Sequence, residues 1–293
     1  MLDDPVGPGP AARSRALPTL LGAAHPAPSF AVAVLVTALA AASGRSTAGC
    51  LLVALAVLTG QLSIGWSNDW IDVARDTAAR RRDKPLVSGA LRTGTVAVAA
   101  GCALALCVPL SLASGLLAGA AHLAGVAAGW CYNLGVKRTA LSWLPYALGF
   151  GLLPAFVALG LPGRPWPPVW LLAAGALLGV GAHVTNVLPD IDADLAAGVR
   201  GLPQRLGQRR AGALAALALL GASAALVLGP PGDPGVVGWA GLGATGALAV
   251  VVSLPPTRWT APDSRAPFLA TLGLAGVDVA LLLLRGAAAH ISG

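Results

Sequence analysis

Residues 68–76 read Asn68-Asp69-Trp70-Ile71-Asp72-Val73-Ala74-Arg75-Asp76. A related stretch begins 118 residues later, at residue 186 rather than 68, and reads Asn186-Val187-Leu188-Pro189-Asp190-Ile191-Asp192-Ala193-Asp194. The two stretches hold six of the twelve acidic residues, and the chain contains no Glu. Each stretch ends a long apolar run, and carboxylates clustered at a membrane boundary are costly unless a cation binds them. A hard divalent metal ion is the simplest such cation, and it points to a phosphorylated substrate.

The composition is that of an integral membrane protein. Of the 293 residues, 56% are hydrophobic and 11% are charged, and the mean hydropathy is +0.76. Soluble domains carry about 25% charged residues. Apolar runs long enough to cross about 30 Å of hydrocarbon lie near residues 24–43, 48–67, 95–112, 115–134, 141–160, 168–188, 211–229, 235–254 and 267–285. These runs predict an all-α fold with nine transmembrane helices.

The chain divides into a short tail and one membrane domain. Residues 1–16 are rich in Pro and Gly and predict a disordered N-terminal tail. Residues 17–293 are expected to form a single transmembrane domain. The tail has no basic start that leads into an apolar region, so it does not resemble a cleaved signal peptide. The first span is therefore expected to direct insertion.

The basic residues predict the orientation in the membrane. A net charge of +7 would suggest nucleic-acid binding in a soluble chain. Here sixteen of the nineteen Lys and Arg fall in the tail and in alternate connections between spans, and only Arg45, Arg164 and Arg285 fall on the opposite side. Because Lys and Arg concentrate in cytoplasmic loops, we expect a multi-pass cell-membrane protein with the N-terminus and both Asp stretches in the cytoplasm and the C-terminus outside. Neither a nucleic-acid partner nor an obligate protein partner is indicated.

The two Asp stretches belong to a longer internal repeat. Its pattern is N-x3-D-x3-D-x5-R-x2-P-x3-G. The members are Asn68, Asp72, Asp76, Arg82, Pro85 and Gly89, and then Asn186, Asp190, Asp194, Arg200, Pro203 and Gly207. Four predicted spans separate the two copies, and an even number preserves orientation, so the repeat is parallel. Both copies are expected on one membrane face, around a shared central cavity.

The spacing of the repeat predicts two rows of metal-binding oxygen atoms. Residues at i, i+4 and i+8 lie on one stripe of a helix, and Asp69 adds a further acidic neighbour. Two facing stripes can hold Mg²⁺ ions around one diphosphate. The predicted metal ligands are Asn68, Asp69, Asp72, Asp76, Asn186, Asp190 and Asp194. Four basic residues follow closely and can neutralise phosphate oxygens: Arg82, Lys84, Arg200 and Arg205. The alternative to a metal site is that these residues are ordinary polar helix ends paired with nearby Arg. The occurrence of two copies at identical spacing makes this alternative less favoured.

These residues resemble motifs of a known family. Asn68-Asp69-x2-Asp72-x3-Asp76 resembles the NDxxDxxxD signature of the UbiA superfamily of intramembrane prenyltransferases, and Asp190-x3-Asp194 resembles its second motif, DxxxD. The segment Lys84-Pro85-Leu86-Val87-Ser88-Gly89 is similar to the RPLxSG-like element of the family, with Lys in place of Arg. The resemblance implies a UbiA-like bundle of nine transmembrane helices around a central cavity.

The resemblance also implies an activity and the residues that perform it. It implies Mg²⁺-dependent transfer of a prenyl group from a prenyl diphosphate to a lipophilic or aromatic acceptor, such as a quinone precursor. The implied catalytic residues are Asp72, Asp76, Asp190, Asp194 and Tyr132. Tyr132 precedes the pair Lys137 and Arg138, as a Tyr often precedes a Lys-Arg pair in the family, so the pair is implied to hold diphosphate and Tyr132 to lie near the carbocation. For Lys137 and Arg138, charge that only sets orientation is an equal alternative.

Two other functions fit the same sequence. A terpene cyclase of the UbiA type, which acts on the prenyl diphosphate alone, shares every motif above. A transporter or lipid-binding membrane protein without chemistry also fits a parallel repeat.

Overall fold

Long runs rich in Ala, Leu and Val form the helices of this protein, because Ala and Leu are strong helix formers. The computed structural model describes residues 10–24, 26–82, 84–253 and 266–284. Its helices are, in chain order, α1 (Pro10–Ala23), α2 (Pro26–Ala42), α3 (Thr47–Ala78), α4 (Thr93–Leu112), α5 (Leu116–Leu134), η1 (Val136–Arg138), α6 (Leu144–Gly151), α7 (Leu153–Ala158), α8 (Val169–Val187), η2 (Leu188–Asp190), α9 (Ile191–Ala196), α10 (Leu202–Leu228), α11 (Gly235–Ser253) and α12 (Ala266–Leu284). Within the described residues there are no β-strands, which confirms the predicted all-α class.

Fewer helices of the structure meet the length and composition of a membrane span than the sequence predicts. Each of the predicted apolar runs coincides with a helix, or with the pair α6 and α7. Among the described residues, four helical segments are long and apolar enough to cross a membrane, or five if the bent pair α1 and α2 is one span. The four are Thr47–Ala78, Thr93–Leu112, Val169–Ala196 and Leu202–Leu228. The count of nine is therefore not confirmed, because helices as short as α6 and α7 do not cross about 30 Å singly.

The N-terminal segment differs in part from the expected disordered tail. Helix α1 begins at Pro10, inside residues 1–16. Residues 1–9 lie outside the described part of the chain, so their expected disorder stays a prediction.

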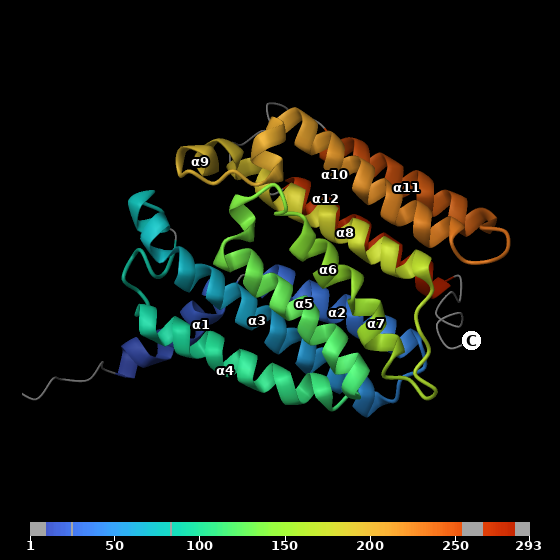
Figure 1. The fold of residues 1–293 in the computed structure, drawn as a ribbon, viewed down its shortest axis with the longest axis horizontal. Coiled ribbons are helices and arrows are strands. Elements are labelled where there is room, and N and C mark those ends of the chain that lie inside the picture. Colours follow the sequence, from blue (N-terminus) through green and yellow to red (C-terminus); the bar gives the residue numbers. More distant parts are fainter. Residues whose placement is uncertain (1–9, 25, 83, 254–265, 285–293) are drawn as a thin grey trace, which may run out of the picture.

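The two motif-bearing halves of the chain lie on opposite sides of the bundle. Helix α3 packs against α2 and α4, and α8 packs against α6 and α10. In Figure 1, α8, α10, α11 and α12 lie along one side of the molecule, and α1, α3 and α4 lie along the other. Helices α2, α5, α6 and α7 lie between these two groups, and the interior of the bundle is enclosed by both halves.

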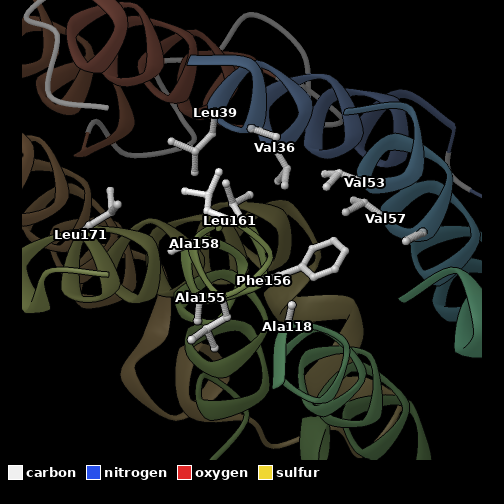
Figure 2. Close-up of a cluster of buried hydrophobic side chains, with 14 of the residues drawn as sticks. Val36, Leu39, Val53, Val57, Ala118, Ala155, Phe156, Ala158, Leu161 and Leu171 are labelled. Carbon is white, nitrogen blue, oxygen red and sulfur yellow. The ribbon is translucent and has the colours of Figure 1, made fainter. Parts of the chain in front are cut away.

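A buried aromatic residue holds the short helix α7 in place. Phe156 is fully buried in a hydrophobic cluster built from α2, α3, α5 and α7. Figure 2 shows its ring between Val57 of α3 and Ala118 of α5. Truncation of a buried Phe to Ala costs about 3–5 kcal/mol. Burial of Phe156 therefore stabilises a helix of six residues that is too short to be stable on its own.

The length of α3 carries the first motif beyond the apolar part of the helix. The helix has 32 residues, so at 1.5 Å per residue it is about 48 Å long, whereas the hydrocarbon core is about 30 Å thick. The motif occupies the last turns before the helix ends at Ala78. At this end of α3, Asn68, Asp72 and Asp76 remain on one helical stripe, as predicted.

The second copy of the repeat has a different backbone. Helix α8 ends at Val187, the 3₁₀ turn η2 contains Pro189, and α9 begins at Ile191. Proline lacks the amide hydrogen and clashes with the preceding turn, which breaks a helix. Further along the chain the two copies again share a backbone conformation, because Gly89 and Gly207 have φ of 78° and 76°. Both copies thus use glycine at a backbone conformation that other residues rarely adopt.

Candidate functional site

One cavity collects residues from both copies of the repeat. Its volume is about 400 Å³, and residues of α2, α3, α5, α6, α8, α10 and α12 line it. Along α3 the lining runs from Gln61 to Asp76, which at 1.5 Å per residue is about 22 Å. Six repeat residues line the cavity: Asn68, Asp72, Asp76, Asn186, Asp190 and Asp194. Motifs that are far apart in the sequence therefore line one cavity.

Asp69 takes a different place from the one predicted. It is not among the residues that line the cavity, and its side chain is only 2% exposed. Its carboxylate accepts a hydrogen bond from Lys84 Nζ at 2.6 Å. Successive residues of a helix point about 100° apart, so Asp69 is turned away from the stripe of Asn68, Asp72 and Asp76. The structure thus pairs Asp69 with a cavity-lining lysine instead of adding it to the predicted metal ligands.

Asp72 is surrounded by two cationic side chains. Lys137 Nζ lies 2.7 Å from Asp72 Oδ1 and 2.6 Å from Oδ2, and Arg75 Nη2 lies 2.8 Å from Oδ2. Lys137 Nζ is also 3.3 Å from Asn68 Oδ1, and Arg75 Nη2 is 3.8 Å from Asp76 Oδ1. Burial lowers the pKa of the Lys137 ammonium group, and the neighbouring Asp72 carboxylate offsets only part of this shift. Both carboxylates of this stripe therefore have positive charge close by.

The hydrogen-bond partners of the second motif are amides, and Arg75 and Arg81 act on Asp194 only from beyond ion-pair distance. Asp194 Oδ2 accepts a hydrogen bond of 2.8 Å from Gln204 Nε2. No ion pair or hydrogen bond reaches the Asp190 carboxylate from the described part of the chain, and Asp190 is exposed to the cavity. Asp192 points elsewhere: it is exposed, does not line the cavity and lies 3.3 Å from Gln208 Nε2.

The predicted phosphate-binding cations separate into two groups. Lys84 and Lys137 line the cavity. The other four are exposed and do not line it: Arg82, Arg138, Arg200 and Arg205. The chain turns at the end of α3, where Arg80 has φ of 54°, so the side chains that follow point in different directions. Repeated spacing in sequence alone could not separate these groups.

Polar cavity residues close to the acidic motifs include three that the sequence analysis did not predict. Arg75, Arg81 and Gln204 all line the cavity. A signal was available for Arg75, which follows Asp72 at i+3 and therefore lies on the same face of α3. Gln204 lies ten residues after Asp194 in a separate helix, and nothing in the spacing indicated their contact.

A family model gives the first outside comparison. The model of the UbiA prenyltransferase family matches residues 29–275 of this chain. The chain belongs to the UbiA prenyltransferase family. None of the curated protein sequences searched matches the chain at a significant level.

Solved structures of UbiA homologues have the same fold. A UbiA homologue from Archaeoglobus fulgidus bound to GPP and Mg²⁺ has a TM-score of 0.68 at 18% identity, covering 93% of this chain and 99% of that one. An apo UbiA homologue from Aeropyrum pernix K1 has a TM-score of 0.67 at 19% identity, covering 87% and 97%. A structure of digeranylgeranylglyceryl phosphate synthase has a TM-score of 0.62 at 16% identity, covering 94% and 99%. With its apolar helices, this UbiA-family chain is a multi-pass membrane protein.

Aromatic side chains form the wall next to the acidic residues of this UbiA-family cavity. Tyr132 and Tyr146, the two tyrosines of the chain, both line it. Their rings meet edge to face with centroids 5.2 Å apart. The ring of His183 lies 5.5 Å from Tyr132 and 4.9 Å from Tyr146, and its Nε2 is 3.1 Å from Ser142 Oγ. The structure places Tyr132 in the cavity lining, the role near a carbocation that the resemblance implies for it stays a prediction, and Tyr146 is a second tyrosine of the lining.

The remainder of the lining is mostly apolar. It includes Val32, Leu35, Val126, Phe150 and Leu153. His122 also lines this part, and its Nδ1 is 2.8 Å from Ser111 Oγ. The cavity therefore joins an acidic, cation-containing region to a hydrophobic one, as a ligand with a charged head and an apolar tail requires.

The oxygen donors of this cavity suit a hard metal ion that is shared with a ligand. The described residues contain no group of three or more His, Cys, Asp or Glu placed to hold a metal by themselves. Mg²⁺ does not need one, because it usually takes one or two carboxylates together with phosphate oxygens and water. The carboxylate and amide oxygens on the two walls therefore fit Mg²⁺ whose remaining ligands are water molecules or, when substrate is bound, diphosphate oxygens.

Proposed function

We propose that this UbiA-family protein transfers a prenyl group from a prenyl diphosphate to a lipophilic or aromatic acceptor, such as a quinone precursor, in a Mg²⁺-dependent reaction. The observation that carries the proposal is the convergence of both acidic motifs and of Lys84 and Lys137 on one cavity with an apolar extension. The UbiA homologue from Archaeoglobus fulgidus bound to GPP and Mg²⁺ supports the assignment of ligand class. The distribution of basic residues supports a cytoplasmic location for the acidic end of the cavity.

The polar residues would bind the diphosphate head. Asn68, Asp72, Asp76, Asn186, Asp190 and Asp194 would hold Mg²⁺. When bound, Mg²⁺ stabilises the negative charge that develops on the leaving diphosphate. Lys84 and Lys137 would donate charge-assisted hydrogen bonds to phosphate oxygens, which are stronger than hydrogen bonds between neutral groups. Asp69 would keep Lys84 directed to the cavity through their 2.6 Å contact.

The reaction replaces the allylic carbon–oxygen bond of the prenyl diphosphate with a bond to the acceptor and releases one proton. The allylic carbon–oxygen bond breaks, and its electron pair leaves with the diphosphate. An electron pair of the acceptor then forms the new bond to the allylic carbon, and the acceptor loses a proton. The faces of Tyr132 and Tyr146 can stabilise the positive carbon through cation–π attraction. The apolar lining keeps water from quenching it.

The test is an assay of the reconstituted full-length protein with several prenyl diphosphates and a panel of acceptors. We expect prenylated product and pyrophosphate release from the wild type. Asp72→Asn and Asp190→Asn should each lower the rate at least about 100-fold, the scale on which loss of one electrostatic group acts. The matched control is Asp192→Asn, an acid of the same motif that does not line the cavity, and it should retain activity.

Other outcomes of the same assay would replace the proposal. Unchanged rates in Asp72→Asn and Asp190→Asn would contradict the assigned roles. A cyclic product made without any acceptor would indicate the UbiA-type terpene cyclase instead. Substrate movement across proteoliposomes without pyrophosphate release would indicate a transporter.

A further inference from the structure

The two acidic motifs have the same spacing in the sequence but different partners in the structure. In the first motif, every carboxylate lies within 4 Å of a lysine or arginine nitrogen: Asp69 of Lys84, Asp72 of Lys137 and Arg75, and Asp76 of Arg75. The three acids thus meet three cations. In the second motif, the carboxylate of Asp194 meets the neutral amide of Gln204, and within the described ranges Asp190 and Asp194 have no ion pair.

The partners of Asp72 prevent a metal ion from reaching it. The Lys137 ammonium contacts both carboxylate oxygens, at 2.7 and 2.6 Å, and Arg75 contacts one of them at 2.8 Å. Asp72 itself is 1% exposed. A metal ion that coordinates these oxygens must first displace the cations. Leaving a buried cation without its anionic partner is strongly unfavourable, so displacement requires a new anion for Lys137 and Arg75.

A diphosphate that binds in the cavity is an anion with which these cations can pair instead of Asp72. Lys137 and Arg75 both line the space into which the head of the proposed substrate would enter. Phosphate oxygens accept strong hydrogen bonds from lysine and arginine. Once these side chains turn to the diphosphate, the Asp72 oxygens become available. Asp190, in contrast, needs no such exchange.

On these grounds we infer that the two motifs load with metal in a fixed order. The second motif binds a metal ion in the absence of diphosphate, with water completing the coordination. The first motif binds one only after a diphosphate has replaced Asp72 as the anionic partner of Lys137 and Arg75. This inference rests on the proposed function, since it assumes that the cavity binds metal and diphosphate. It makes Arg75 and Lys137 positioning residues that couple the two ligands, so that binding of diphosphate strengthens binding of metal and the reverse. The complete site then forms only in the presence of substrate.

Manganese binding tests the order without any turnover. Mn²⁺ bound by the detergent-solubilised full chain is measured by electron paramagnetic resonance, with and without inorganic pyrophosphate. Without pyrophosphate we expect Mn²⁺ binding that Asp190→Asn removes and Asp72→Asn leaves unchanged. With pyrophosphate we expect additional Mn²⁺, which Asp72→Asn removes. The double variant Arg75→Gln/Lys137→Gln should bind the additional Mn²⁺ at least tenfold more tightly than the wild type when pyrophosphate is absent.

The double variant keeps the test independent of folding defects, because it is expected to gain metal binding. The matched control is Arg82→Gln, which removes an exposed arginine that does not line the cavity and should bind Mn²⁺ as the wild type does. Loss of pyrophosphate-independent binding in Asp72→Asn, full loading of both motifs without pyrophosphate, or no gain in the double variant would each overturn the inference. Absence of prenylated product from the wild type would overturn the proposed function and leave the measured order of metal binding intact.

Discussion

Asp69 and Asp72 are three residues apart in α3 and have different surroundings. Asp72 lines the cavity, and Asp69 is buried beside Lys84 on another face of the helix. An acidic residue inside a metal-binding motif can therefore act by holding a lysine in place. Its contribution should appear in stability and in diphosphate binding, and not in metal binding.

Substitution Asp69→Asn tests this distinction. It removes the carboxylate charge that lies 2.6 Å from Lys84 Nζ, and breaking a buried pair from one side costs on the order of 3 kcal/mol. We expect a lower free energy of unfolding in detergent, weaker binding of prenyl diphosphate and unchanged Mn²⁺ affinity. The double variant Asp69→Asn/Lys84→Gln should recover part of the stability, since it removes both charges of the ion pair together. A loss of Mn²⁺ affinity as large as that of Asp190→Asn would instead make Asp69 a metal ligand.

At the scale of elements, close contact between α6 and α8 sets the aromatic wall of the cavity. A Cβ atom on Gly175 would lie 2.7 Å from the carbonyl oxygen of Phe150, and one on Gly179 would lie 2.8 Å from the carbonyl carbon of Tyr146. Real Cβ atoms do not approach backbone this closely. Glycine at these two positions of α8 thus lets α6 carry Tyr146 to the cavity, as small residues do between membrane helices.

Substitution Gly179→Ala should therefore force α6 and α8 apart. We expect a loss of about 1–3 kcal/mol in stability, as for other overpacked sites, together with a lower rate of prenyl transfer because Tyr146 moves. Thermal unfolding in detergent and the transfer assay measure the two effects. The control is Gly101→Ala in α4, where a Cβ would meet nothing within 4 Å. Equal melting temperatures for the two variants would show that the α6–α8 contact is not limiting.

For the whole molecule, the orientation in the membrane decides from which side the substrate head enters. Arg164 precedes α8 and Arg200 follows it, and both side chains are exposed. Because a membrane-spanning helix separates them, they are expected on opposite faces, with Arg200 in the cytoplasm.

Labelling of single cysteines tests this orientation. In a background that lacks the four native cysteines, Arg200→Cys should react with a membrane-impermeant maleimide only in inside-out vesicles. Arg164→Cys should react only in right-side-out vesicles. The reversed pattern would place both acidic motifs outside the cell, and reaction of both from one side would show that α8 does not cross the membrane.

The sequence by itself determined the helical membrane class, the position of both motifs and the family. These properties depend on hydropathy, on helical periodicity and on residue spacing, which are local along the chain. The sequence also shows the internal repeat, including Gly89 and Gly207, which both have positive φ in the structure.

Only the tertiary structure decided which charges meet. Lys137 reaches Asp72 across 65 residues of sequence, and Gln204 reaches Asp194 from another helix. Such contacts depend on the rotation and packing of whole helices, which the apolar pattern only loosely specifies in an environment where lipid is as apolar as the interior. For this reason two motifs of equal spacing received unequal partners, cations for one and amides for the other.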